Sequence, residues 1–180
     1  MRARLAKAVR DYFARKMQAE LPQFVPSRSK PVPQGDSLYL WDFSRSLKFY
    51  VFLQVNQKPG QDSFTIELAC SSGDFPFSHA ALGPTQQKDG SVRFRLPQLY
   101  RDEWRPKTGW EPWWWIGLRV EPGEITSKAV ARAVVGKRPL IEGAVSIEQA
   151  LLRIEPQVND AVDRIKRFGV PFFEQYAKRD

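Results

Sequence analysis

The chain has 180 residues and a mass of 20.8 kDa, a length that suits one domain able to fold without disulfides or metals. A hydrophobic content of 42% and a charged content of 27% exclude a disordered chain, and no apolar run approaches the roughly 20 residues of a membrane span. The chain has one cysteine, Cys70, and one histidine, His79, which excludes an internal disulfide and argues against a zinc site. We therefore expect no metal and no cofactor.

The net charge of +8 is concentrated at the two ends of the chain. Residues 1–30 hold eight Lys or Arg against two acidic residues, residues 31–124 hold ten against eleven, and residues 125–180 hold ten against seven. Positive charge gathered in this way favours a polyanion or an acidic protein surface as a partner. The alternative is a solvated helix face that is basic for solubility alone.

The basic N-terminus does not have the composition of a targeting segment. It lacks the apolar core and the cleavage site of a secretory signal, and residues 1–25 contain none of the Ser and Thr typical of a transit peptide. Together with the single cysteine, this predicts a bacterial, cytoplasmic protein.

Residues 1–21 predict a basic amphipathic helix. Apolar residues recur every three or four positions from Leu5 to Met17, and Pro22 ends the pattern. Residues 22–36 then predict a proline-rich connector without regular structure. The cations that we expect to contact a polyanion are Arg4, Lys7, Arg10 and Arg15.

Three runs rich in aromatic and β-branched residues predict an antiparallel meander, over residues 37–43, 47–56 and 63–70. The third run alternates apolar and polar side chains, which is typical of a sheet with one buried face. Residues 91–96 and 113–120 predict a fourth and a fifth strand.

An apolar stripe from Ile147 to Phe168 predicts a long C-terminal helix. Pro156 interrupts the stripe, so we expect a kink or a break there, and Gly169 with Pro171 should end the helix.

These elements predict a single α+β domain over residues 1–180. An antiparallel sheet of about five strands, within residues 37–124, is covered by the N-terminal helix and by a long, Pro-interrupted helix within residues 125–180. Because the apolar face of the sheet needs a cover, we expect the first helix to pack on the sheet and not to bind a membrane surface.

Residues 100–124 hold five of the six tryptophans. Tryptophans often anchor a core, but five within twelve residues exceed what one sheet face readily buries, so we expect some of them to be exposed. The expected partner-binding residues are Trp104, Trp110, Trp114, Arg101 and Arg105. Exposed Trp beside Arg suits a protein interface, and it equally suits a stacking platform for single-stranded nucleic acid.

Catalytic motifs are absent from the sequence. It has no glycine-rich phosphate motif and no nucleophile elbow. A Cys70–His79 pair, or the acids Glu111, Glu121 and Glu124, would be the groups of an enzyme, but small cysteines are common in buried strands and these acids lie near turn residues. We therefore assign no catalytic residue and no metal ligand.

Three short fragments carry a resemblance: GDSLYLW at 35–41, FTIELAC at 64–70 and GVPFF at 169–173. They resemble small bacterial domains of unknown function that have an N-terminal helix, an antiparallel sheet and a C-terminal helix ending in a Pro-Phe-Phe-like segment. The resemblance spans most of the chain and implies no catalytic residue. It implies an accessory or immunity-like role, because some of these families resemble proteins encoded beside toxins or defence genes.

We therefore expect a non-enzymatic accessory or immunity-like protein that docks a partner protein through a Trp/Arg-rich surface. The first alternative is a nucleic-acid-binding accessory domain that uses the basic N-terminal helix. The second alternative is an enzyme of unrecognised type.

Overall fold

The computed structural model describes residues 2–27, 36–56, 63–76, 84, 86–88, 90–100, 114–115 and 147–178. The strands are β1 (Val25–Ser27), β2 (Ser37–Asp42), β3 (Lys48–Asn56), β4 (Ser63–Ser71), β5 (Val92–Arg95) and β6 (Trp114–Trp115). The helices are α1 (Arg2–Glu20), the 3₁₀ helix η1 (Leu96–Leu99), α3 (Ile147–Arg164), the π-helical η2 (Ile165–Gly169) and α4 (Val170–Ala177). The described strands form an antiparallel sheet in the order β1-β2-β3-β4-β5, and β6 also pairs with β4. The predicted α+β arrangement is confirmed.

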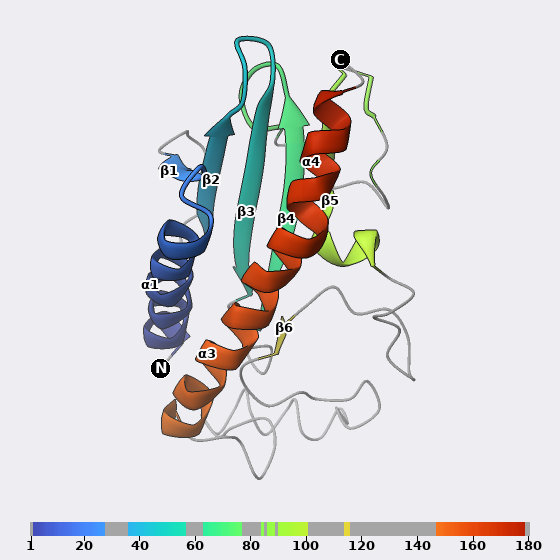
Figure 1. Ribbon diagram of the computed structural model, residues 1–180. Helices are drawn as coiled ribbons and strands as arrows, with labels where there is room; N and C mark the ends of the chain where they lie inside the picture. Colours follow the sequence, from blue (N-terminus) through green and yellow to red (C-terminus); the bar gives the residue numbers. More distant parts are fainter. Residues whose placement is uncertain are drawn as a thin grey trace, which may run out of the picture.

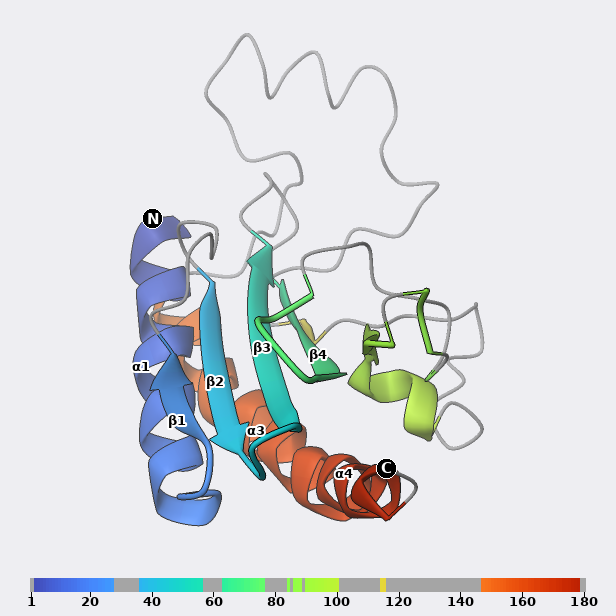
Figure 2. The ribbon, with the colours of Figure 1, turned by 90° about the horizontal axis from the view of Figure 1, so that it is seen from above.

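Both long helical segments lie on the same face of the sheet (Figure 1). Seen from above, α1 lies beside β1 and β2, and the C-terminal helix crosses the sheet below β3 and β4 (Figure 2). Phe13 of α1 meets Tyr39 edge to face with the ring centroids 5.5 Å apart, and Phe173 of α4 stacks on Phe49 at 4.6 Å. The expected packing of the first helix on its own sheet is therefore confirmed.

The helix-facing side of the sheet is apolar because every second residue of each strand points to it. On β3, Phe49, Val51 and Leu53 point this way, and each is completely buried. Phe64 and Leu68 do the same on β4. Burial of each such side chain contributes about 1.5–3 kcal/mol, so this face supplies most of the hydrophobic stabilisation.

Strand β1 lies where the sequence predicted an irregular connector, and that prediction is wrong for Val25–Ser27. These residues pair with Leu38–Leu40 of β2. Pro26 has no backbone N–H, which an outer strand tolerates because only one of its sides has to pair. A three-residue strand with a central proline has no pattern that a sequence reading could recognise.

The C-terminal helix continues without a break through Pro156, where the sequence predicted a kink or a break, and past Gly169 and Pro171, where it predicted an end. Pro156 lies inside α3, and the chain stays helical through η2 into α4. In η2 the N–H of Val170 bonds to the carbonyl oxygen of Ile165, and this wider turn leads to Pro171 in the first turn of α4, where a missing N–H costs little. The predicted end at Gly169 and Pro171 is therefore wrong.

No helix in the described ranges is both long enough and apolar enough to cross a membrane.

Candidate functional site

The edge of β4 that faces away from β3 pairs with two strands. Strand β3 pairs with β4 along its whole length, so β5 and β6 both occupy the other edge. Arg95 at the end of β5 lies opposite Glu67, and Trp114 at the start of β6 lies opposite Phe64. Three residues of a strand span about 10 Å, so Arg95 and Trp114 lie close together along this edge.

Trp114 fixes the return of the chain to the sheet. Its ring stacks on Phe64 with the centroids 5.5 Å apart and an interplanar angle of 9°. Its indole Nε1–H donates a hydrogen bond to Oδ2 of Asp160 in α3, at 2.7 Å. Trp114 is only 3% exposed, so the expectation that it is exposed for partner binding is wrong. It is buried because β6 places it on the helix-facing side, where Asp160 satisfies its N–H.

Arg164 links this contact to the point where the chain leaves. Its Nε donates to Oδ1 and Oδ2 of Asp160 at 3.0 and 2.9 Å, one helical turn away. The guanidinium carbon lies 4.5 Å from the centroid of the Tyr100 ring, and that ring packs on Phe168 at 4.8 Å. Tyr100 and Trp114 are the described residues on either side of segment 101–113, so the Asp160–Arg164 pair holds both ends of that segment.

The other predicted partner-binding residues, Trp104, Trp110, Arg101 and Arg105, fall within 101–113 and lie outside the described residues. The structure therefore locates the two ends of this segment. Sequence reasoning missed Asp160, Arg164 and Tyr100 as the residues that hold it. The i, i+4 spacing of Asp160 and Arg164 is a recognisable ion-pair signal, but nothing in it points to a tryptophan 46 residues away.

The basic residues predicted to contact a polyanion lie on α1, and ion pairs neutralise part of its charge. Lys7 is exposed and pairs with Asp11, whose pKa the hydrogen bond from Lys7 lowers. Arg15 is exposed and lies over the Tyr12 ring, with its guanidinium carbon 5.3 Å from the ring centroid. Arg10 is half-buried, and the side chain of Arg4 lies outside the described residues.

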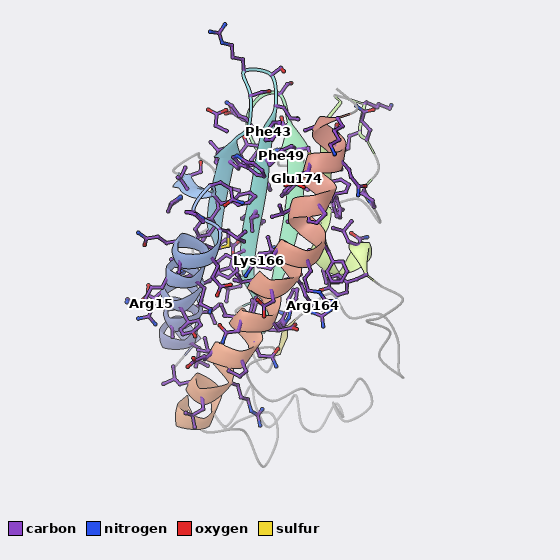
Figure 3. All side chains as sticks on the ribbon, in the orientation of Figure 1. Arg15, Phe43, Phe49, Arg164, Lys166 and Glu174 are labelled. Atoms are coloured by element: carbon purple, nitrogen blue, oxygen red, sulfur yellow. The ribbon has the colours of Figure 1, made fainter. Side chains whose placement is uncertain are left out.

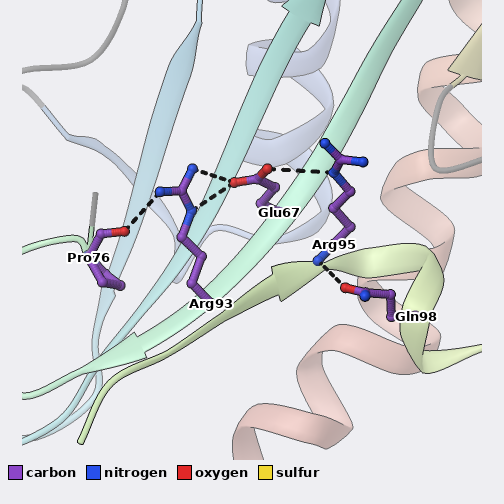
Figure 4. Close-up of polar contacts among 5 residues, drawn as sticks. All are labelled: Glu67, Pro76, Arg93, Arg95 and Gln98. Carbon is purple, nitrogen blue, oxygen red and sulfur yellow. Dashed lines mark hydrogen bonds and ion pairs between the residues drawn. The ribbon is translucent and has the colours of Figure 1, made fainter. Parts of the chain in front are cut away.

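The second face of the sheet carries a buried ionic cluster (Figure 4). Arg93 donates from Nε to Glu67 Oε2 at 2.8 Å, its Nη2 lies 2.6 Å from the same oxygen, and its Nη1 donates to the Pro76 carbonyl at 3.0 Å. Nε of Arg95 lies 3.8 Å from Glu67 Oε1. The guanidinium carbon of Arg93 also lies 4.9 Å from the ring centroid of Phe75. These contacts hold the segment after β4 against the sheet, so the cluster acts as a structural clamp.

Asp36, just before β2, is the carboxyl with the largest change in acidity among the described acids. Burial raises its pKa to about 6, and the negative charge of Glu67 acts in the same direction. The N–H of Val55 donates to its Oδ1 at 2.9 Å and opposes this shift by stabilising the charged form.

The groups considered for an enzyme do not form a described site. Cys70 is completely buried on the helix-facing side of β4, out of reach of an external substrate. His79 and the acids Glu111, Glu121 and Glu124 lie outside the described residues. In the part of the chain that the structure describes, no three His, Cys, Asp or Glu side chains are grouped to hold a metal ion.

Comparisons with protein-family models, curated proteins and solved structures find no match, so the resemblance to bacterial domain families stays a prediction.

Proposed function

We propose that the chain is a non-enzymatic accessory or immunity-like protein that binds a partner protein through segment 101–113. The observation that carries this proposal is the attachment of both ends of the segment to one residue pair, Asp160–Arg164. The scaffold beneath is rigid, since α3 packs on α1 and on the sheet. Binding residues often lie on a loop that a rigid scaffold positions.

The composition of the segment supports a protein partner. Trp104 and Trp110 are the proposed apolar anchors, and Arg101 and Arg105 the proposed donors around them, because Trp and Arg dominate the binding energy at protein interfaces. Closely spaced ends reduce the number of conformations that the segment loses on binding, which favours affinity. Trp114 takes a different part in this proposal, as the anchor to the scaffold.

Binding of nucleic acid through α1 is the alternative. The helix has six basic residues against two acidic ones, which supports it. Lys7 is paired with Asp11, and Lys16 with Glu20, so part of this charge is already balanced within the fold. We therefore favour a protein partner over nucleic acid. We also propose the cytoplasm as the compartment of the protein.

The test is capture of partners from the host's own lysate with tagged full-length protein, with and without nuclease. The proposal expects one protein in stoichiometric amount that survives nuclease. Trp104→Ala and Trp110→Ala should each abolish the capture. The matched control is Phe43→Ala, because Phe43 is also an exposed aromatic (42%) but lies at the hairpin end of β2 and β3, far from β6 (Figures 1 and 3).

Two outcomes would contradict the proposal. Capture that persists in both tryptophan variants, with the fold intact, would exclude the segment as the docking surface. A captured protein that disappears on nuclease treatment would support the nucleic-acid alternative instead.

A further inference from the structure

The π-helical turn η2 changes which side chains of the following helix face the sheet. With about 100° of rotation per residue in an α-helix, Phe172 would lie roughly 20° from Ile165 and Phe173 roughly 80° from it. An uninterrupted α-helix would therefore place Phe172 against the sheet, on the same side as Ile165. In the structure Phe173 is completely buried and Phe172 is only half-buried. The side chain that enters the core is thus one residue later than α-helical spacing predicts.

The hydrogen bond that closes η2 explains this shift. The N–H of Val170 bonds to the carbonyl oxygen of Ile165, five residues earlier, whereas an α-helix pairs residues four apart. The turn therefore holds one residue more than an α-helical turn, and the residues after it are rotated back by about 100°. This rotation brings Phe173 onto Phe49 of β3, where the two rings stack.

The sequence of α4 would also fit a second register. Without the π-turn, Phe172 and Tyr176 would share the sheet-facing side, because they lie four residues apart. With the turn, Phe173 and Ala177 occupy that side, and Phe172 instead meets Phe94 of β5 edge to face at 4.9 Å. Both registers bury apolar side chains, so the hydrophobic effect by itself does not choose between them.

Two residues at the turn favour the observed register. Gly169 lies against β4, and a Cβ atom at this position would be 3.2 Å from Cδ1 of Leu68, closer than ordinary van der Waals contact. Pro171 lies in the first turn of α4. In an uninterrupted α-helix it would lie in the interior, where its ring would meet the carbonyl group of Arg167. The glycine therefore lets the turn approach the sheet, and the proline disfavours the register without the turn.

We propose that η2 is a register lock, a one-residue insertion held by Gly169 and Pro171 that places Phe173 and not Phe172 in the core. The lock is a conformational device of the scaffold and does not depend on the proposed function.

The test of the insertion compares two single-residue deletions in the full-length protein that carries Pro171→Ala. Deletion of the exposed Arg167 removes the extra residue and leaves α4 facing the sheet as before, so the thermal midpoint should fall by less than about 5 °C. The matched control is deletion of Asp163, which is also exposed and lies four residues earlier. It moves Lys166 into the buried position of Ile165, so the midpoint should fall by more than about 10 °C.

A second comparison tests the role of the proline. Phe173→Ala should lower the thermal midpoint about half as much, or less, in the Pro171→Ala background as in the wild type. The reason is that, without the proline, the helix can lose its π-turn and place Phe172 in the vacated position. Val162→Ala is the matched control, because Val162 is completely buried in α3 before the turn, and it should lower the midpoint equally in both backgrounds.

Three results would overturn the proposal. A loss on deletion of Arg167 as large as the loss on deletion of Asp163 would show that η2 holds no extra residue. An equal loss for Phe173→Ala in both backgrounds would show that Pro171 does not select the register. Failure of Pro171→Ala alone to fold would also contradict the lock, because alanine is compatible with both registers.

Discussion

The indole N–H of Trp114 and the carboxylate of Asp160 are joined by a 2.7 Å hydrogen bond, 46 residues apart in sequence. The bond ties a strand of only two residues to the C-terminal helix. It converts one of the expected surface tryptophans into part of the scaffold, and through Arg164 it connects to Tyr100 on the other side of segment 101–113. This contact places the two described residues that flank segment 101–113, Tyr100 and Trp114, on one residue pair of the C-terminal helix.

Trp114→Phe removes the indole donor and keeps an aromatic ring against Phe64. We expect a loss of about 1 kcal/mol in the free energy of unfolding, because Asp160 still accepts from Arg164. Trp114→Ala should cost about 3–5 kcal/mol, since it also leaves a cavity in the core. Urea denaturation of both variants measures the two losses. Equal losses would mean that the hydrogen bond, and not the ring, carries the contribution of Trp114.

Glu67→Gln should destabilise the protein by about 3–5 kcal/mol, because it removes the carboxylate that pairs with the buried guanidinium of Arg93. The double variant Glu67→Leu/Arg93→Met should recover most of that loss, since it removes both charges together. Denaturation of the single and double variants measures the coupling between the two positions. The control is Asp11→Asn, which breaks the exposed pair with Lys7 and should leave stability unchanged. A double variant no more stable than the single one would contradict the clamp.

Asp36 should make the protein less stable as the pH rises through about 6. Its pKa is raised from 3.8 to about 6 by burial, so the folded state favours the protonated carboxyl, and the stabilisation is complete below about pH 4 and lost above about pH 6. Asp36→Asn should remove this pH dependence and raise the free energy of unfolding at pH 8 by about 1–2 kcal/mol. This value is smaller than the pKa shift alone would give, because the carboxyl is partly exposed to solvent.

The measurement for Asp36 is urea denaturation of wild type and variant between pH 5 and 8. Below this window Glu20 acts in the opposite direction, because hydrogen bonds from Lys16 and Lys166 lower its pKa and that stabilisation is lost on acidification. Parallel pH profiles for the two proteins would show that Asp36 does not cause the slope.

Phe173→Ala should cost about 3–5 kcal/mol, because Phe173 is completely buried and stacks on Phe49. This variant tests whether α4 belongs to the core, although the sequence predicted that the helix ends before it. The adjacent Glu174 is exposed, so Glu174→Ala is the matched control and should change stability by less than about 0.5 kcal/mol. Similar effects of the two substitutions would contradict the packing of α4 on the sheet.

The parts of the fold that follow from local patterns could be predicted from the sequence. Alternation in β4 and the aromatic runs of β2 and β3 predicted the meander, because strand residues alternate between two faces. Apolar residues recur every three or four positions in α1 and therefore share one face of the helix, which predicted that α1 packs on the sheet. Helix-breaking residues gave the wrong end of the C-terminal helix, because a π-helical turn places Pro171 where no N–H is needed.

The parts of the site that depend on long-range contacts could not be predicted. The composition around Trp104, Trp110 and Trp114 indicated an unusual segment, but the sequence does not indicate which of these tryptophan rings is buried in the core. That choice depends on the pairing of β6 with β4 and on an acceptor in α3. Residue types alone specify neither, since each depends on which distant segments pack together.

The most direct measurement is the affinity of the captured, purified partner for three proteins: wild type, Trp104→Ala/Trp110→Ala and Phe43→Ala. Isothermal titration calorimetry at physiological salt, with nuclease-treated samples, gives the three dissociation constants. We predict that the double tryptophan variant loses at least about a hundredfold in affinity, as expected when anchor residues are truncated, and that Phe43→Ala binds like the wild type. Equal affinities for the wild type and the double tryptophan variant would contradict docking through segment 101–113.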